Sequence, residues 1–230
     1  MLEAKKLCMR YDETLALKDL SFSVAPGEIF CLLGQNGAGK TTTINIFLGL
    51  LSPTSGEALI NNESVVKNKS VKNAIAYIPE IVQLYGNLSG LENLEFFSQL
   101  AGFTYTKEQL SDFLQQANLQ EETYGKKLDT YSKGMRQKVG IAIALAKNAS
   151  YILMDEPTSG LDPKASVEFA NTCKELASKG VGIFMATHDI FNAVNIGSRI
   201  GIMKEGSLIH TTETSKITAQ ELQDLYIKTI

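Results

Sequence analysis

The sequence lacks the features of a secreted or membrane-spanning chain. It has three cysteines among 230 residues, Cys8, Cys31 and Cys173, and none of them forms a Cys-x-x-Cys pair. We expect them to be buried thiols in a reducing cytosol. The first ten residues carry charges throughout and contain no apolar segment typical of a secretory signal. No uncharged apolar run approaches the roughly 20 residues of a membrane helix. We therefore expect a cytoplasmic protein, for which any membrane role requires a partner.

An excess of positive charge is also missing. The chain has 22 Lys and Arg against 25 Asp and Glu, which gives a net charge of −3. This composition provides no overall attraction to phosphate polymers, so we expect no nucleic-acid partner. Internal repeats and low-complexity tracts are absent as well. The mixture of 44% hydrophobic and 20% charged residues is typical of a globular protein, and the length favours one α/β domain with an inserted lobe.

Four short apolar runs predict buried strands. They show no polar alternation, which is typical of a parallel sheet covered on both faces, and helical segments lie between them. The sequence therefore predicts a three-layer α/β core. The four predicted strands are residues 29–33, 75–78, 151–154 and 181–186.

Helix and turn signals divide the rest of the chain. From about residue 84 to 148, apolar residues at helical spacing replace the strand pattern, which predicts a helical lobe inserted into the core. Asp162 followed by Pro163 predicts a helix start, and Gly180 its end. Thr218 and Glu221 fit a capping box. The Lys204-Glu205-Gly206 sequence predicts a hairpin turn.

A phosphate-binding loop lies between the first of these predicted strands and a helix. The sequence Gly34-Gln35-Asn36-Gly37-Ala38-Gly39-Lys40-Thr41 matches the P-loop pattern, and its strand-loop-helix context is the required one. The glycines allow backbone N–H groups to approach phosphate oxygens, and the helix N-terminus adds a favourable dipole. We expect Lys40 to reach the β- and γ-phosphates and the Thr41 hydroxyl to bind Mg²⁺.

Two carboxylates follow the predicted strand 151–154. Asp155 and Glu156 stand where the ligands of open α/β sheets bind. Asp155 is suited to the coordination shell of Mg²⁺, and Glu156 is suited to polarising the water that attacks the γ-phosphate. Taken alone, the pair could equally begin an exposed loop before Pro157. The P-loop in the same chain favours a site over that alternative.

Further motifs complete a family resemblance. Four more motifs follow in order along the chain. They are Glu80 after Tyr77-Ile-Pro, Tyr131-Ser132-Lys133-Gly134-Met135, Ser159-Gly160-Leu161-Asp162, and Thr187-His188-Asp189. Over essentially its whole length the chain resembles the nucleotide-binding subunits of ATP-binding cassette (ABC) transporters. The signature segment around Ser132 and the Pro-Glu variant resemble the subgroup that pairs with ABC-2-type permeases, which are commonly exporters.

The resemblance implies a fold, partners and cofactors. The expected fold is an α/β P-loop NTPase core with a mostly parallel sheet, an antiparallel β subdomain and a helical subdomain; residues 84–148 form that subdomain within a core of residues 1–83 plus 149–230. The implied cofactors are ATP and Mg²⁺. The implied partners are a second cassette, as a homodimer or heterodimer, and an integral membrane permease that holds the chain at the inner face of the cell membrane.

The resemblance also implies site residues. Glu156, His188 and Lys40 are the expected catalytic residues, His188 as a sensor of the γ-phosphate. Ser132 and Gly134 would hold the γ-phosphate across the dimer interface, and Tyr11 would lie on the adenine face. The metal ligands would be Thr41, Asp155 and Glu80. The full set of expected nucleotide-binding residues is Tyr11, Gly34, Asn36, Gly37, Ala38, Gly39, Lys40, Thr41, Thr42, Ser132 and Gly134.

Three residues depart from the family pattern. Lys133 replaces a glycine and Met135 a glutamine in the signature, while Glu80 replaces the usual glutamine and adds negative charge beside the phosphates, which a metal must offset. Altered metal dependence is therefore predicted. Two other readings stay open: a soluble cassette ATPase of an assembly process, and a P-loop GTPase or small-molecule kinase. The second would need a base-recognition element such as Asn-Lys-x-Asp, which does not occur.

Overall fold

A computed structural model describes residues 1–230, and its strands form two sheets. The larger sheet has six strands in the order β10-β9-β3-β8-β7-β6 and is parallel except for β10, which pairs antiparallel with β9. The smaller sheet has four strands, in the order β2-β1-β4-β5, and is antiparallel. The strands are β1 (Leu2–Tyr11), β2 (Thr14–Val24), β3 (Ile29–Leu33), β4 (Ser55–Ile60), β5 (Glu63–Ser64), β6 (Ile75–Ile78), β7 (Tyr151–Asp155), β8 (Gly182–Thr187), β9 (Arg199–Lys204) and β10 (Ser207–Glu213).

All four strands predicted from apolar runs are present. β3 and β6 have the predicted bounds, β7 extends one residue further, and β8 is displaced by one residue toward the C-terminus. The displacement arises because Val181 still belongs to the preceding helix end, where its N–H donates to the Leu176 carbonyl. The predicted turn at residues 204–206 joins β9 to β10, and Glu205 and Gly206 both have positive φ angles there.

The helices begin at the residues that their capping signals indicate. Asp162 accepts the Ala165 N–H, with Pro163 in the first turn. The Thr218 and Glu221 capping box is formed. No helix combines the length and apolarity of a membrane span. The helices are α1 (Lys40–Phe47), α2 (Gly90–Leu100), α3 (Lys107–Gln116), α4 (Lys133–Ala146), α5 (Pro163–Ser178), α6 (Ile190–Ile196) and α7 (Ala219–Thr229), with 3₁₀ turns η1 (Lys69–Ala74), η2 (Glu121–Thr123), η3 (Leu128–Thr130) and η4 (Thr214–Lys216).

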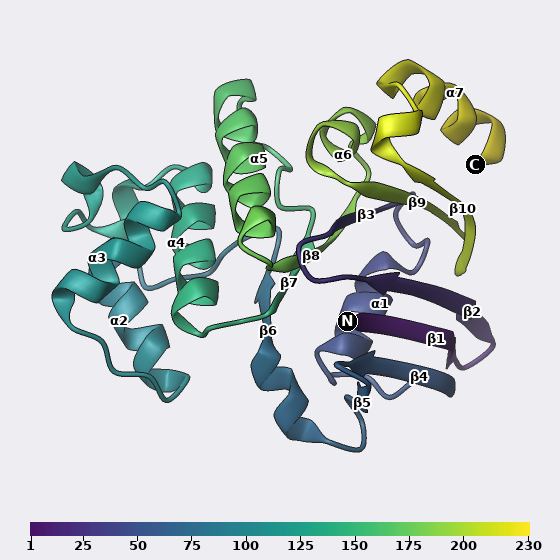
Figure 1. Cartoon of the computed structure of the whole chain (residues 1–230), viewed down its shortest axis with the longest axis horizontal. Coiled ribbons are helices and arrows are strands. Elements are labelled where there is room, and N and C mark those ends of the chain that lie inside the picture. The colour runs from purple at the N-terminus through teal and green to yellow at the C-terminus, as the bar shows by residue number, and fades with distance from the viewer.

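The segment between β6 and β7 is helical. It contains α2, α3 and α4, which lie together at one end of the molecule, while the antiparallel sheet lies at the other end (Figure 1). The three helices contact one another, and α4 also contacts β6 and α5. Tyr105, just before α3, donates its hydroxyl to the Ala146 carbonyl at the end of α4 over 2.6 Å. The signature helix α4 therefore connects this group of helices to the large sheet.

The two faces of the large sheet bury different cores. Alternate residues of β3 and β8 point to opposite faces, as strand geometry requires. Phe30 and Phe184 lie on the face that packs against α1 and the antiparallel sheet, where both rings stack on Phe22 of β2 at centroid distances of 5.3 and 5.1 Å. Their neighbours Cys31 and Ile183 pack on the opposite face with α4, α5 and α6. The expected three layers are present, but one outer layer is largely a second sheet.

The cysteines differ from one another. Cys31 and Cys173 are fully buried, and burial raises the pKa of the Cys31 thiol to about 12. The expectation of burial is wrong for Cys8, which is partly exposed on β1 of the antiparallel sheet and donates its thiol to Asp19 over 3.3 Å. The sequence signal failed here because β1 is covered on one face only, so half of its residues face solvent.

Candidate nucleotide-binding site

The P-loop follows β3 and leads into α1. Gly39, immediately before the helix, has a φ of 109°. A Cβ atom at this position would lie 2.7 Å from the Ala16 carbonyl oxygen and 2.7 Å from the Met203 side chain. Only glycine fits both the backbone angle and the close packing. The motif therefore reflects the packing of β2 and β9 against the loop as well as the approach of a ligand.

Main-chain hydrogen bonds hold this loop in place. The Gly206 N–H of the β9–β10 turn donates to the Ala38 carbonyl over 2.9 Å, and the Gly206 carbonyl accepts from Lys18 of β2 over 2.8 Å. The loop is thus bound to a turn that lies far from it in the sequence. Such a preorganised loop has little freedom left to lose when it binds an anion.

Lys40 is a buried cation. Its side chain is 6% exposed, and its ammonium group donates to the carbonyls of Gly34 and Gln35 over 2.6 and 3.2 Å. The same ammonium lies 3.6 Å from Glu156 Oε1. Because the cation already faces the loop interior, it can bind a phosphate placed there with little rearrangement.

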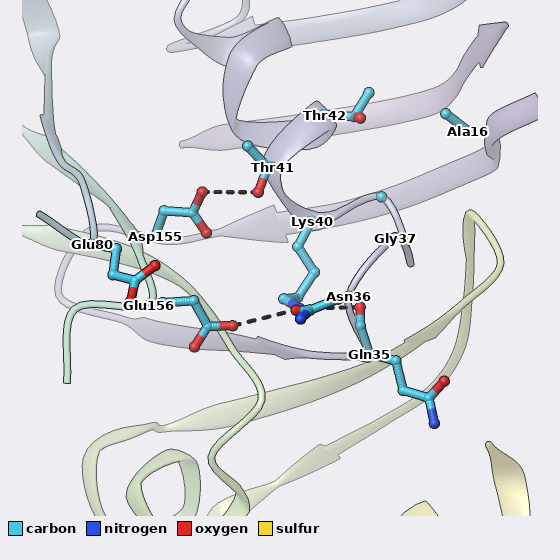
Figure 2. Close-up of a pocket in the computed structure, with 11 residues that line it drawn as sticks. Ala16, Gln35, Asn36, Gly37, Lys40, Thr41, Thr42, Glu80, Asp155 and Glu156 are labelled. Atoms are coloured by element: carbon cyan, nitrogen blue, oxygen red, sulfur yellow. Dashed lines mark hydrogen bonds and ion pairs between the residues drawn. The ribbon is translucent and has the colours of Figure 1, made fainter. Parts of the chain in front are cut away.

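A cavity of about 370 Å³ surrounds Lys40. Figure 2 shows the P-loop side chains on one side and the carboxylates of Glu80, Asp155 and Glu156 facing them. The three carboxylates come from the ends of β6 and β7, the neighbouring strands of the sheet. The residues that line the cavity are Ala16, Gln35, Asn36, Gly37, Gly39, Lys40, Thr41, Thr42, Glu80, Asp155 and Glu156.

Asp155 and Thr41 are paired at the base of the cavity. The Thr41 hydroxyl donates to Asp155 Oδ2 over 2.9 Å (Figure 2). The pKa of Asp155 is raised, first by burial and then by the negative charges of Glu156 and Glu80, and the Thr41 hydrogen bond and Lys40 offset this only in part. The neighbouring groups therefore do not supply enough positive charge to balance the ionised Asp155 carboxylate.

This donor set fits Mg²⁺. The available ligands are a hydroxyl and carboxylates, which are the oxygen donors that this hard cation prefers. No three acidic, histidine or cysteine side chains form a complete metal site by themselves. That arrangement agrees with the usual binding of Mg²⁺ through one or two carboxylates together with substrate phosphates and waters. Thr41, Asp155 and Glu80 are the residues that could hold it.

Glu156 is strained and incompletely paired. Its backbone φ is 46°, in the left-handed region that non-glycine residues rarely adopt. Its Oε2 accepts a hydrogen bond from the backbone N–H of His188 over 3.3 Å and lies 2.9 Å from Nδ1 of the same residue, while its buried Oε1 has no hydrogen-bond partner. The free oxygen can accept a proton from a water molecule, which is the chemistry of a general base.

Six of the expected residues do not line the cavity. They are Tyr11, Gly34, Ala38, Ser132, Gly134 and His188. Tyr11 is at the tip of the β1–β2 hairpin and is 42% exposed, while Ala16 of the same hairpin lines the cavity. Ser132 and Gly134 begin α4 and do not line the cavity either. The Ser132 hydroxyl caps that helix by accepting the Met135 N–H over 3.3 Å.

Two contacts to Glu80 were not found from the sequence. The Ser159 hydroxyl donates to Glu80 Oε1 over 2.9 Å, and the buried Gln137 side chain donates to the Glu80 carbonyl over 3.1 Å. Ser159 begins the motif after β7, and Gln137 follows the signature segment, so both residues are far from Glu80 along the chain. Only the packing of α4 against the loop after β6 reveals that they meet.

The fold and this cavity together define a P-loop nucleoside triphosphatase. The model of the family described as ABC transporter matches residues 17–159, more than half of the chain. The chain therefore belongs to the ABC transporter family, as an ATP-binding subunit with the ATPase activity of that family. The α/β fold, with its parallel sheet, antiparallel sheet and helices, is the fold of this family's cassettes.

Known proteins with similar sequences carry the same description. The chain is 33% identical over 228 residues to the uncharacterized ABC transporter ATP-binding protein YxlF of Bacillus subtilis, covering 98% of this chain and 75% of that protein. It is 35% identical over 211 residues to the bacitracin transport ATP-binding protein BcrA of Bacillus licheniformis, covering 91% and 68%.

Solved structures agree. The ATP binding subunit of an ABC transporter superposes with a TM-score of 0.85 at 31% identity, covering 99% of this chain and 98% of that one. The dimeric post-hydrolysis state of the ATP-binding cassette MJ0796, bound to ADP and Pi, superposes with a TM-score of 0.80 at 29% identity, covering 93% and 99%.

Proposed function

We propose that this subunit binds Mg-ATP in the P-loop cavity, dimerises head to tail around two ATP molecules, and drives a separate membrane permease of the ABC-2 export type. The observation that carries the proposal is the division of the site into two parts. Lys40, Thr41, Asp155 and Glu156 line the cavity, whereas Ser132 and its helix lie outside it. A second copy is needed to bring a signature helix to the same nucleotide.

The residues of the cavity divide the chemistry between them. Lys40 binds the β- and γ-phosphates, and Glu156 orients the attacking water and takes its proton. His188, whose Nδ1 atom lies 2.9 Å from Glu156 Oε2, holds the carboxylate and contacts the γ-phosphate when the dimer closes. Thr41, Asp155 and Glu80 would hold Mg²⁺, which would supply positive charge to offset the negative charge that develops on the phosphates. Tyr11 stacks on the adenine.

The helical lobe offers a surface for a permease. Tyr85 and Phe96 are 49% and 40% exposed, and their rings pack edge to face with centroids 5.0 Å apart. Ile81, three residues before the lobe, is 64% exposed. Exposed apolar groups that cluster in this way mark interaction sites. We propose that residues 84–148 move as a lobe against residues 1–83 plus 149–230, and that this apolar cluster passes the motion to the permease. The subunit would then lie at the inner face of the membrane.

Two relatives support export as the direction. BcrA is named for bacitracin transport and LnrL of Bacillus subtilis for linearmycin resistance, and this chain is 35% and 33% identical to them. We infer that the cargo is chosen by the permease, because the cavity of this chain is built for a nucleotide.

The Glu156→Gln variant tests the ATPase part of the proposal. The amide cannot accept a proton, so hydrolysis should fall at least ~100-fold while ATP still binds. The variant should also remain a dimer in saturating Mg-ATP, because the closed state is no longer released. Phosphate release and sedimentation velocity measure the two effects, with Glu121→Gln on the surface as the matched control. A monomeric or fully active Glu156→Gln protein would contradict the mechanism.

Co-purification tests the permease. The tagged chain is solubilised gently with Mg-ATP from its native cells, and its partners are identified by mass spectrometry. We expect a polytopic membrane protein, and we expect the doubly substituted Ile81→Ser, Phe96→Ser variant to lose it while keeping ATPase activity in solution. Recovery of soluble partners alone would favour the alternative function, a soluble ABC-type ATPase of an assembly process.

A further inference from the structure

The two charged departures from the family pattern lie next to each other. Glu80 follows β6, and Lys133 is the first residue of α4, but the Lys133 Nζ atom lies 3.8 Å from Glu80 Oε1. The sequence gives no reason to connect a change in the loop after β6 with a change in the signature segment. The fold brings the added negative charge and the added positive charge together.

The Glu80 carboxylate is held from two sides. The same oxygen, Oε1, accepts the Ser159 hydroxyl over 2.9 Å. The Lys133 ammonium also lies beside Gly160, where a Cβ atom would be 3.7 Å from Nζ. Lys133 therefore lies beside the loop that follows β7 and approaches the same carboxylate oxygen as Ser159. The three segments that meet here are the loop after β6, the start of α4 and the loop after β7.

The same face of α4 also fixes the Glu80 backbone. Gln137 stands one turn after Lys133, and side chains four residues apart lie on one face of a helix. Gln137 is fully buried and donates to the carbonyls of Pro79 and Glu80 over 3.3 and 3.1 Å. Since the backbone is anchored, the Lys133 ion pair and the Ser159 hydrogen bond act on the direction of the carboxylate and not on the position of the loop.

The cavity needs this extra cation. Its charged lining residues are Lys40 and the carboxylates Glu80, Asp155 and Glu156, one positive charge against three negative ones, so the lining carries a formal charge of −2. A polyphosphate must enter this negative environment. Lys133 lies outside the lining and lowers the imbalance to −1. Without Glu80 the lining would have a charge of −1 and Lys133 would have no carboxylate to balance.

We propose that Lys133 is a positioning residue for Glu80, which offsets the charge of the carboxylate and aims it at the metal-binding edge of the cavity. The inference rests on the proposed function, since it concerns how that site binds Mg-nucleotide. Glu80 and Lys133 act as one compensated pair. The pair replaces the neutral glutamine and glycine of the family pattern, and it makes the metal requirement of the site depend on a residue of the signature helix.

The test is a double-mutant cycle read by equilibrium binding. A fluorescent, non-hydrolysable ATP analogue, mant-AMP-PNP, is titrated with Mg²⁺ on the wild type, Lys133→Met, Glu80→Gln and the double variant. Lys133→Met keeps the apolar stem and removes the charge. It should raise the Mg²⁺ concentration for half-maximal binding about two- to fivefold, the range of a partly exposed ion pair, and the effect should shrink in high salt. In the Glu80→Gln background the same change should have no effect.

Two controls separate positioning from a general loss of charge. Lys133→Arg keeps the positive charge and should restore the wild-type Mg²⁺ dependence. Lys138→Met removes a cation from the same helix, but its ammonium pairs with Glu168 over 2.7 Å, on α5 and away from the cavity. It should leave the Mg²⁺ dependence unchanged. Melting temperatures of all variants show that each is folded.

Each outcome of the cycle has one meaning. An unchanged Mg²⁺ titration of Lys133→Met in the wild-type background overturns the inference. An equal shift in both backgrounds also overturns it, because Lys133 would then act on the nucleotide directly and not through Glu80. If the wild type does not bind the analogue at all, the proposed function fails and this inference fails with it. If the wild type binds the analogue but the two residues show no coupling, the inference about Lys133 is overturned and the proposed function stands.

Discussion

At the scale of single residues, Glu156 adopts an unfavourable backbone conformation that directs its carboxylate into the site. Its left-handed backbone, with a φ of 46°, costs on the order of 1 kcal/mol or more for a residue with a side chain. The backbone is held in place by the Glu156 N–H, which donates to the Ala186 carbonyl over 2.9 Å. The strain aims the carboxylate at Lys40 and His188. The sequence indicates the carboxylate but not the turn that directs it.

Asp155 should destabilise the protein in the absence of metal at neutral pH. Its pKa is raised above 3.8, chiefly by burial, so the folded state holds a proton more readily than the unfolded state. The protonated Asp155 therefore contributes favourably to the free energy of unfolding. This contribution is complete below pH 3.8 and is lost as the pH rises through the raised pKa of the folded state. We therefore expect Asp155→Asn to raise the melting temperature at pH 7 without nucleotide or Mg²⁺, and the gain to vanish toward about pH 4.

Thermal melts over this pH range measure the effect. Asp112→Asn, at an exposed position of α3, is the matched control and should change little at any pH. In saturating Mg-ATP the order should reverse, because Asp155 then has a cation to bind. A melting temperature of Asp155→Asn below that of the wild type at pH 7, without ligands, would contradict this account.

Much of the site could be predicted from contiguous motifs. The sequence predicts the P-loop residues, Asp155 and Glu156 because each motif lies within a few residues of sequence and has a recognisable strand context. It does not predict Ala16, which enters the cavity only because β2 packs against the P-loop. The Lys133 and Glu80 contact also depends on packing between segments that are far apart. Spacing along the chain carries no information about such contacts.

At the scale of elements, buried strands were easier to predict than half-exposed ones. β3 is buried at all five positions and stands out as an apolar run. β1 and β2 alternate, but register shifts interrupt their pairing, and Lys6 and Asp19 have positive φ angles at those places. Each bulge changes which face the following residues occupy, so the two-residue period is lost. The antiparallel sheet was therefore expected from the family resemblance and not from the pattern of β1 or β2.

The contact between α3 and the end of α4 provides a test at this scale. The Tyr105 hydroxyl donates to the Ala146 carbonyl, one of the last carbonyls of α4, which would otherwise lack a helical partner. Tyr105→Phe should lower the free energy of unfolding by about 1 kcal/mol without changing ATP binding. Urea denaturation measures the change. Tyr85→Phe, at a 49% exposed side chain with no hydroxyl hydrogen bond, should be neutral, and an equal loss for both would contradict the assignment.

At the scale of the whole molecule, the large sheet combines strands from distant parts of the sequence. β3 lies in the middle of the order β10-β9-β3-β8-β7-β6, between strands that come much later in the chain. The sequence predicts that these strands are parallel and buried, but it gives neither their order nor the identity of the layer on each face. On one face the layer is identified by the stacking of Phe22 on Phe30 and Phe184, which joins the two sheets.

The central place of β3 has a consequence for biosynthesis. Ile29 pairs with Ile183, and Phe30 pairs with Arg199, so neither edge of β3 has its partner until most of the chain has been made. At about 5–20 residues per second, this wait is on the order of ten seconds. During that time a strand that is apolar at every position remains without its native neighbours in the nascent chain. We expect ribosome-associated chaperones to bind this segment until β8 and β9 emerge.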